Sequence, residues 1–243
     1  MIVYAHRGEN HSQLENTKAA FDAAVAHGFR ALEFDLVRLR DDSVVVFHDD
    51  DLKRLAGRDL RPADLNYAEF REVFPQLLSV YEFVTHYGRL GLDLNFEIKD
   101  DVRTFELIEP LLGLCDSAVI SSFHHEIVDH ARARGVAGAY LFDTEADIAA
   151  AHDTFVSAPR IHIDTALVPR LTELPPWLPS AAAADAAGRE IFVFTINTPA
   201  DAFQLLTEAE AAGHPVAGFY TDTAELAPFD SQYAARALHG LAG

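Results

Sequence analysis

Short apolar runs rich in branched and aromatic residues alternate along the chain with alanine-rich stretches of helical periodicity. The runs that predict strands are residues 2–5, 31–37, 92–97, 117–121, 137–142, 160–163, 191–196 and 217–220. The stretches that predict helices are residues 15–27, 67–87, 101–113, 124–134, 145–152, 177–187 and 199–211. Strands that alternate with helices along a whole chain are typical of a parallel sheet. Eight such strands predict an α/β fold, a single (β/α)8 barrel of the TIM type.

One further β-like run, residues 43–48, does not fit this alternation. Asp41-Asp42 leaves no room for a crossover helix, so we expect the run to return antiparallel to the strand before it. A two-residue turn there would place Asp35 opposite His48. Glu33 shares the face of Asp35 because side chains alternate along a strand. The hairpin is therefore predicted to gather two carboxylates and an imidazole at one point.

The predicted barrel has the length of one domain, and we interpret residues 1–243 as such. Residues of about 49–90, which follow the hairpin, are expected to form a short cap segment and a helix. No sequence repeat of about 20 to 50 residues is visible, which argues against a solenoid.

The charge balance limits the classes of partner. A formal net charge of −19 argues strongly against a nucleic-acid partner, whose phosphates need a basic surface. It argues less against a small phosphorylated substrate, which a few local cations can hold. Cys115 is the single cysteine, so the chain can form neither an internal disulfide framework nor a thiolate metal cluster.

The apolar segments are short. No run approaches the ~20 residues that a membrane-spanning helix needs, so we expect no stable membrane insertion. The N-terminal residues show no basic region followed by a long apolar segment and a cleavage site, and we therefore expect a cytoplasmic chain.

Charged residues gather where the first three predicted strands end, and barrels carry their chemistry at this end of the strands. They are His6 and Arg7 at the end of the first strand, Glu33 and Asp35 near the end of the second, and Glu97 and Lys99 at the end of the third. Three carboxylates that converge in one barrel mouth would raise one another's pKa unless a cation lies among them. Carboxylate oxygens suit a hard ion better than they suit zinc or copper, so the pattern predicts one divalent cation, Mg²⁺ or Ca²⁺.

Two cationic side chains and two histidines complete the predicted site. Arg7 and Lys99 add positive charge beside the metal, and together they make a receptor for a phosphate group. His6 and His48 can then supply a general acid and a general base.

Eight short motifs now carry a resemblance to a known family. They are AHRG (5–8), ENT (15–17), EFD (33–35), FHDD (47–50), NFEIK (95–99), SSF (121–123), FTIN (194–197) and YTD (220–222). In this order and spacing the chain resembles the glycerophosphodiester phosphodiesterases, relatives of the phosphatidylinositol-specific phospholipase C barrels.

The resemblance implies a role for each candidate residue. His6 and His48 would be the acid/base pair; Glu33, Asp35 and Glu97 would hold the metal; Arg7 and Lys99 would contact phosphate. Three further residues have supporting roles. Asn16 lies in a loop close enough to touch substrate, Asp49 would orient His48, and Phe194 would form an apolar wall.

The chain departs from the family pattern in several places. Leu14 stands where the family usually has proline, Asp41-Asp42 replaces the usual Asp-Gly turn, and Phe194 replaces a tryptophan. The threonines that usually follow the His-Asp pair are missing, although Leu52 and Arg54 remain recognisable, and the cap is shorter than in many relatives. These last two changes bear on the choice of substrate rather than on the metal or the histidines.

Three groups allow a second interpretation. Lys99 can be a Schiff-base lysine, but Glu97 two residues away favours a charged, ion-paired lysine. His124-His125-Glu126 suggests a metal cluster, yet adjacent helical residues diverge and cannot chelate together. His162 and Asp164 can point into the barrel mouth, but we favour a structural pair.

The function predicted is metal-dependent hydrolysis of small glycerophosphodiesters to glycerol 3-phosphate and an alcohol, by acid/base catalysis of two histidines and through a cyclic phosphate. Two rivals stay open. One is a related lysophospholipase D or sphingomyelinase D-like phosphodiesterase, and the other is a non-catalytic barrel that binds glycerol phosphate.

Overall fold

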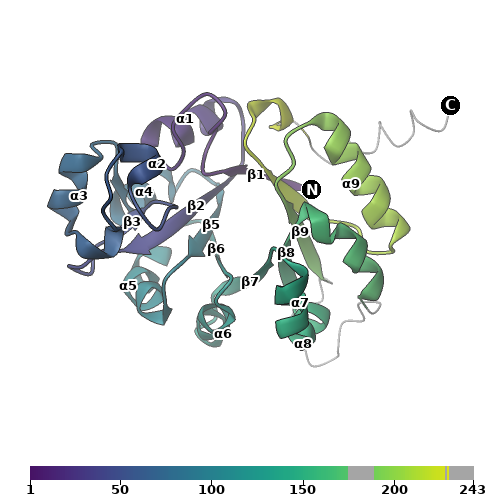
Figure 1. The fold of residues 1–243 in the computed structure, drawn as a ribbon. Helices are drawn as coiled ribbons and strands as arrows, with labels where there is room; N and C mark the ends of the chain where they lie inside the picture. Colours follow the sequence, from purple (N-terminus) through teal and green to yellow (C-terminus); the bar gives the residue numbers. More distant parts are fainter. Residues whose placement is uncertain (175–188, 228, 230–243) are drawn as a thin grey trace.

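Eight parallel strands close into a barrel in the computed structural model, which describes residues 1–174, 189–227 and 229 (Figure 1). They are β1 Ile2–His6, β2 Ala31–Arg38, β5 Asp93–Ile98, β6 Ser117–Ser122, β7 Ala137–Phe142, β8 Arg160–Asp164, β9 Glu190–Phe194 and β10 Gly218–Thr221. The ring closes because β1 pairs in parallel with β10 on one side and with β2 on the other. The predicted barrel is therefore confirmed.

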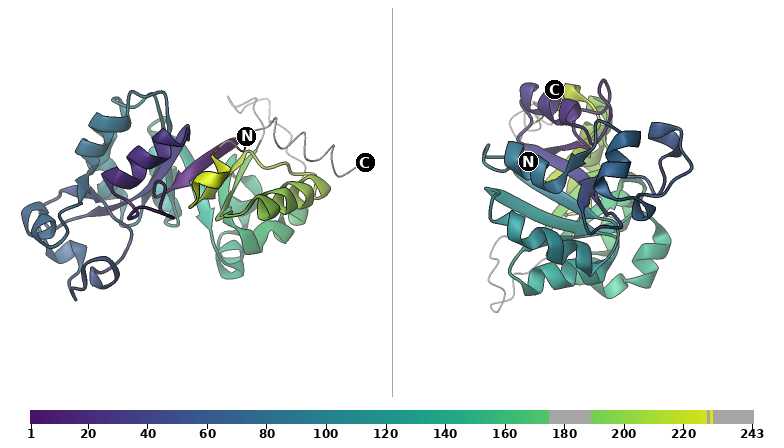
Figure 2. Two further views of the ribbon diagram at one scale, coloured as in Figure 1. Left: turned by 90° about the horizontal axis from the view of Figure 1, so that it is seen from above. Right: turned by 90° about the vertical axis from the view of Figure 1, so that its left-hand side faces the viewer.

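Helices surround the strands and bury their apolar faces on them (Figures 1 and 2). They are α1 Lys18–Ala26, α4 Val80–Tyr87, α5 Val102–Leu112, α6 His125–Ala133, α7 Glu145–Ala150, α8 His152–Ser157 and α9 Pro199–Ala211, with 3-10 turns at Thr165–Glu173 and Ala224–Leu226. In one part of this layer, the buried rings of Phe21, Phe34 and Phe83 lie in contact. The helix predicted at 145–152 ends early and a second helix follows it, and the helix predicted at 177–187 lies outside the described residues.

The helix predicted over residues 67–87 is wrong, because the chain forms two helices there. α3 Tyr67–Val73 ends before Pro75, and a short strand, β4 Leu78–Ser79, separates it from α4. Proline lacks a backbone N–H and disfavours the helical conformation in the residue before it, and Phe74 accordingly has φ −131° and ψ 83°. A capping box opens each helix, which the sequence also encodes.

The hairpin after β2 forms, but with a register one residue away from the predicted one. β3 Val44–Val46 pairs antiparallel with β2 so that Val37 lies opposite Val45, and the loop has three residues instead of two. Its last residue, Asp42, has φ +62°, the left-handed conformation that completes such loops. The backbone N–H of Phe47 therefore donates to the backbone carbonyl of Asp35, at 3.0 Å, and His48 is not the cross-strand neighbour of Asp35.

The cap segment has a small apolar core of its own. It contains α2 Lys53–Ala56, a 3-10 turn at Pro62–Asp64, α3 and β4. Its buried side chains are Val37, Leu39, Val45, Phe47, Leu52, Leu65, Phe70, Phe74 and Leu77. Phe47, the first residue after β3, contributes to this core rather than to the barrel. The next residue, His48, lines the cavity at the barrel mouth. In Figure 2 the cap lies at the opposite end of the molecule from α9.

We expect Glu82→Gln to lower the free energy of unfolding by about 1 kcal/mol at pH 7, the usual order for loss of a cap. The Glu82 carboxylate accepts bonds from the Ser79 backbone N–H and hydroxyl and from the Tyr67 hydroxyl. Burial opposes its ionisation, but these bonds dominate and lower the pKa of Glu82 to about 2.

A carboxylate with a lowered pKa stabilises the fold above its ordinary pKa near 4.5, and this contribution disappears as the pH falls toward about 2. The difference between the wild type and Glu82→Gln, measured by urea unfolding, should therefore shrink in that window. Glu72→Gln is the control, because Glu72 is exposed on α3 and its side chain makes no hydrogen bond or ion pair within the described residues. Equal effects of both substitutions would contradict the expectation.

Candidate active site

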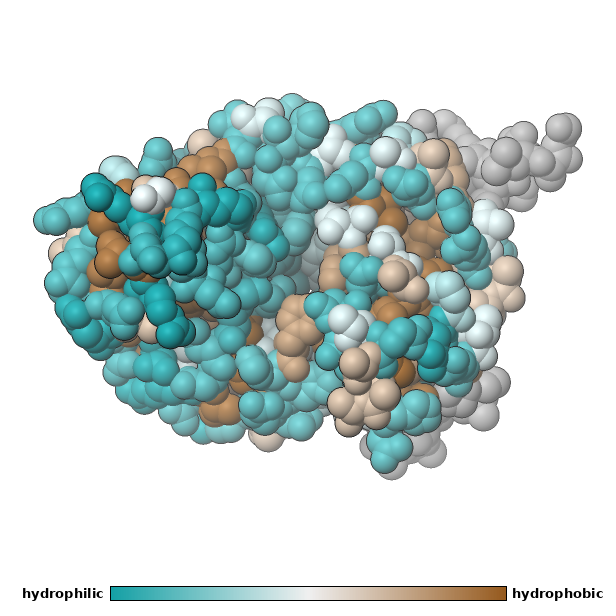
Figure 3. Space-filling view, viewed as in Figure 1, coloured by the Kyte–Doolittle hydropathy of each residue, from teal (hydrophilic) through white to brown (hydrophobic). Residues whose placement is uncertain are grey.

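A cavity of about 310 Å³ opens at the barrel mouth, where the strands end. Its lining residues include His6, Arg7, Glu33, His48, Asn95, Glu97, Lys99, Phe123, Leu141, Asp143, His162, Phe194 and Tyr220. Figure 3 shows a hollow in the middle of this face, with a hydrophilic surface on the cap side and more hydrophobic residues across from it. The structure thus brings the predicted charged residues and Phe194 to one place.

Three carboxylates converge beneath the cavity. Oxygens of Glu33, Asp35 and Glu97 lie within 4.8 Å of one another, and the residues Glu33 and Asp35 are only 2% and 1% exposed. Burial, and then the charge of Asp35, raise the pKa of Glu33. One oxygen of Glu33, Oε1, is buried without a hydrogen-bond partner within the described residues.

This cluster fits a hard divalent cation. All three donors are carboxylate oxygens, which such ions prefer. A cation would also relieve the repulsion that raises the pKa of Glu33 and would give its unpartnered oxygen a ligand. The protein therefore contains a site with the charge and the donor set of a Mg²⁺ or Ca²⁺ centre.

Two cationic side chains flank the carboxylates. Lys99 Nζ lies 2.8 Å from Glu97 Oε1 and 3.3 Å from Asp35 Oδ1, while Arg7 Nε lies 3.2 Å from Asp35 Oδ2. Burial would raise the pKa of Asp35, but Arg7 and then Lys99 outweigh it and lower that pKa. Burial opposes the charge of Lys99, but the ion pairs with Glu97 and Asp35 raise its pKa, which favours a charged, ion-paired lysine over a Schiff-base nucleophile.

The loop after β1 directs Arg7 into the site. Gly8 has φ +83°, and a Cβ there would lie 2.7 Å from the backbone of Ala20, so only glycine fits this close approach. Farther along the loop, Asn16 Nδ2 donates to Asp35 Oδ2 at 2.9 Å, and Thr17 rather than Asn16 caps α1. Asn16 is therefore buried against the carboxylate cluster.

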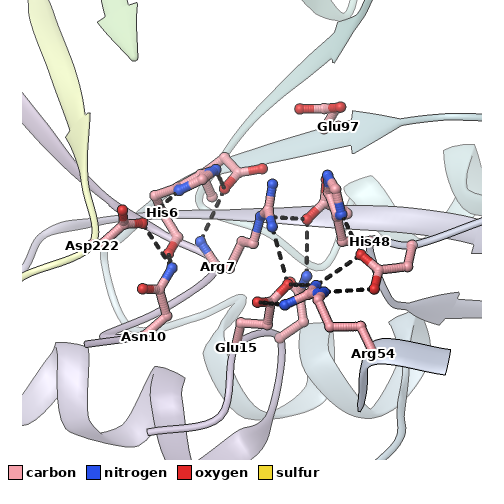
Figure 4. Close-up of polar contacts among 12 residues, drawn as sticks. His6, Arg7, Asn10, Glu15, His48, Arg54, Glu97 and Asp222 are labelled. Atoms are coloured by element: carbon pink, nitrogen blue, oxygen red, sulfur yellow. Dashed lines mark hydrogen bonds and ion pairs between the residues drawn. The ribbon is translucent and has the colours of Figure 1, made fainter. Parts of the chain in front are cut away.

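His6 is oriented by a residue from the opposite end of the chain. Its Nδ1 lies 2.7 Å from Asp222 Oδ1, and its Nε2 faces Glu33 Oε2 at 3.9 Å (Figure 4). Burial lowers the pKa of His6, but the bond to Asp222 and the charge of Glu33 outweigh this effect and raise it. The amides of Asn10 and Asn197 hold Asp222 in turn. Asp222 lies in the motif YTD, directly after a strand, but the sequence alone did not indicate this role.

His48 has a corresponding partner next to it in the chain. Its Nδ1 lies 2.7 Å from Asp49 Oδ1, and Arg54 of α2 binds both oxygens of Asp49 (Figure 4). Arg54 also binds Glu15, which contacts Arg7. Sequence reasoning gave no role to Glu15 or Arg54, although both lie in recognisable motifs.

Apolar and neutral groups complete the cavity. The rings of Phe123 and Phe194 meet edge to face, with centroids 6.4 Å apart. His162 does not pair with Asp164 as expected. It is fully buried and contacts the Tyr220 hydroxyl, with Nδ1 at 2.8 Å, while Asp164 caps the 3-10 turn that follows it.

The tripeptide His124-His125-Glu126 forms no metal cluster within the described residues. His125 Nε2 instead lies 3.2 Å from the carbonyl oxygen of Leu141 and its ring packs on Tyr140. The second candidate metal group in the described chain, Glu15 with His48 and Asp49, is already bridged by Arg54.

Comparisons with known proteins agree with this geometry. The model of the glycerophosphoryl diester phosphodiesterase family matches residues 6–82. A glycerophosphodiester phosphodiesterase of Bacillus altitudinis is 28% identical over 144 residues, which is 51% of this chain and 58% of that protein. The solved structure of a glycerophosphodiester phosphodiesterase from Thermotoga maritima superposes with a TM-score of 0.74 at 25% identity, covering 93% of this chain and 96% of that one. The family model, the curated relatives and the solved structures thus all support the glycerophosphodiester phosphodiesterase family for this chain.

A second curated relative and a second solved structure also resemble this chain. Human lysophospholipase D GDPD1 is 46% identical over 65 residues, 27% of this chain and 21% of that protein. An Oleispira antarctica phosphodiesterase, solved in complex with its product sn-glycerol-3-phosphate, has a TM-score of 0.73 at 22% identity and shares the fold over 97% of both chains. The chain spans little more than half of the length of the curated Bacillus relative. Within the described residues, no helix combines the length and apolar character needed to cross a membrane.

Proposed function

We propose that this chain hydrolyses glycerophosphodiesters to glycerol 3-phosphate and an alcohol, using a divalent cation and two histidines. One observation carries the proposal: two histidines, each held at Nδ1 by a carboxylate, line one cavity beside a cluster of three carboxylates and two cationic side chains. The family and the product bound to the Oleispira relative support the substrate class. The lining residues run from His6 to Tyr220, and Arg54 of the cap binds Asp49 and Glu15 beside them, so we propose that barrel and cap work as one domain.

Each residue has a task in this scheme. Glu33, Asp35 and Glu97 hold Mg²⁺ or Ca²⁺. When bound, such an ion lowers the pKa of a hydroxyl and offsets charge on phosphoryl oxygens.

Arg7 and Lys99 bind the phosphate and direct its phosphorus toward the histidines. A carboxylate at Nδ1 fixes each imidazole in the tautomer whose Nε2 is free to move a proton.

The proton transfers then proceed in two steps. One histidine takes the proton of the glycerol 2-hydroxyl, whose oxygen attacks phosphorus, while the other histidine gives its proton to the departing alcohol oxygen. The product is a cyclic phosphate. With the roles reversed, water opens the ring to glycerol 3-phosphate and returns both histidines to their starting protonation states.

A second candidate is a lysophospholipase D. The identity to the human lysophospholipase D and the apolar wall of Phe123, Leu141 and Phe194 favour it, because an acyl chain needs apolar surface. A non-catalytic glycerol phosphate binder is disfavoured, since binding alone has no use for two oriented histidines.

A release assay separates these functions. We expect purified protein to form glycerol 3-phosphate from glycerophosphocholine, to lose this activity in excess chelator, and to regain it with added Mg²⁺ or Ca²⁺. Lysophosphatidylcholine is offered in parallel, with formation of choline as the measurement. Turnover of the lysolipid alone would favour lysophospholipase D, and binding of glycerol 3-phosphate without turnover of either compound would favour the passive binder.

A further inference from the structure

We propose that Arg54 is a positioning residue for this reaction, a guanidinium that fixes the loop of His48 to the loop of Arg7. The expected effect on kcat and KM rests on the proposed function. The expected effect on the orientation of His48 rests on the geometry alone. Arg54 belongs to the cap, on α2, and does not line the cavity. It acts through the residues that it binds.

The first contact fixes the partner of His48. Arg54 donates from Nε to Asp49 Oδ2 and from Nη2 to Asp49 Oδ1, both at 2.7 Å. The same oxygen, Asp49 Oδ1, also accepts the hydrogen bond from His48 Nδ1, at 2.7 Å. His48 and Asp49 are adjacent residues beyond the end of β3, without regular structure around them. A neighbour in a loop can orient a side chain only if it is itself anchored, and Arg54 supplies that anchor.

The second contact reaches the phosphate-binding side. Arg54 donates from Nη1 to Glu15 Oε2 at 2.6 Å and from Nη2 to Glu15 Oε1 at 2.7 Å. Glu15 Oε1 also accepts Arg7 Nη1 at 3.0 Å. Carboxylate oxygens of Glu15 and Asp49 lie within 4.8 Å of each other, so the two groups would repel each other without a cation between them. Their side chains are 14% and 17% exposed, whereas that of Arg54 is 49% exposed, so the guanidinium covers them from outside.

The shape of the guanidinium matters as well as its charge. Four N–H groups in one plane donate hydrogen bonds to two carboxylates. The ammonium group of lysine, which is a compact point charge, cannot replace this planar arrangement. Without this fork, Asp49 can rotate away from His48, whose proton is then no longer confined to Nδ1. Glu15, now without Arg54, competes more strongly for Arg7. We therefore expect kcat to fall through His48 and KM to rise through Arg7.

The test compares Arg54→Lys and Arg54→Gln with Lys53→Gln. Lys53 is the preceding residue of α2, and within the described residues its ammonium pairs only with the carboxylates of Asp51 and Asp59 at the surface. With glycerophosphocholine as substrate, both Arg54 variants should lose about 10- to 100-fold in kcat, the order expected from a misplaced catalytic group. Lys53→Gln should retain the wild-type kcat and KM. Thermal unfolding of each variant shows what fraction is folded at the assay temperature.

Two further measurements separate positioning from folding and from the assigned reaction. Guanidinium ion at millimolar concentration should restore part of the activity of Arg54→Ala, whereas ammonium ion should not. The ¹⁵N shifts of the His48 ring should show one tautomer, protonated at Nδ1, in the wild type and a mixture in Arg54→Gln. This second measurement needs no activity, so it remains decisive if the wild type does not hydrolyse glycerophosphodiesters.

The proposal is overturned by any of three results. Retention of the wild-type kcat by Arg54→Lys would reduce the role of Arg54 to its charge. A loss of activity that only follows the unfolded fraction would make Arg54 a structural residue. An unchanged His48 tautomer in Arg54→Gln would show that Asp49 needs no anchor.

Discussion

Glu33→Gln is expected to abolish detectable binding of a divalent cation and with it most of the activity. Glu33 is buried, offers an oxygen without a partner, and lies within 4.8 Å of two more carboxylates. Loss of a residue that only supports a metal ligand costs about 10- to 100-fold in affinity, so loss of a ligand should cost more. Asp35→Asn and Glu97→Gln should each weaken binding in the same way.

The same substitution should stabilise the metal-free protein. Burial raises the pKa of Glu33, so its ionisation costs stability, and the cost grows as the pH rises above the ordinary pKa of a glutamate. Glutamine removes that cost. At pH 7 we therefore expect Glu33→Gln to melt at a higher temperature than wild type in chelator.

Thermal melting with and without Mg²⁺ or Ca²⁺ measures both effects. The wild type should gain stability with metal, and Glu33→Gln should not. Glu126→Gln is the control, because Glu126 is exposed on α6 and should leave the metal response intact. Full activity in excess chelator, or an equal metal response in Glu33→Gln, would rule out this centre.

The sequence predicted the elements whose signals are local. α9 runs over residues 199–211 as predicted, because Thr198 and Pro199 mark its start and alanine-rich turns follow. The carboxylates were found because alternation along strands needs no knowledge of distant residues. Where a local signal was overlooked, as with Pro75 inside the predicted helix over 67–87, the prediction was wrong.

The partners of the histidines depend on distant parts of the chain. Asp222 and His6 are 216 positions apart in sequence, and they meet only because β10 closes the barrel against β1. Arg54 reaches Glu15 only because the cap folds over the first loop. The hairpin register depended on whether the loop had two or three residues, and an Asp-Asp pair fits either turn. In each case the sequence did not indicate how the loops and distant segments between the strands and helices come together in space.

Removing either histidine should reduce kcat by about 10²–10⁴, the range for a group that transfers a proton. His6→Ala and His48→Ala each remove one of the two oriented imidazoles of the cavity. The metal ligands are carboxylates in this scheme, so the metal content of both variants should match wild type. His124→Ala is the control, because the His124 side chain is exposed and does not cap the helix that it precedes.

The double variant tests whether the two histidines act together. An acid and a base that serve the same step are not additive, so the loss in the double variant should be far smaller than the product of the single losses. Two independent binding residues would instead multiply their effects and raise KM. A variant that keeps the wild-type kcat while only KM rises would assign that histidine to binding.

The pH profile gives the last check on this arrangement. Two titrating imidazoles should give a bell-shaped profile of kcat/KM, with limbs between about pH 5 and 9. The bond to Asp222 raises the pKa of His6, because the carboxylate favours the imidazolium. Asp222→Asn removes this charge, so the limb that reports His6 should move to lower pH while the other limb stays in place. If both limbs stayed in place, His6 would not be one of the two titrating groups, and the two-histidine scheme would be wrong.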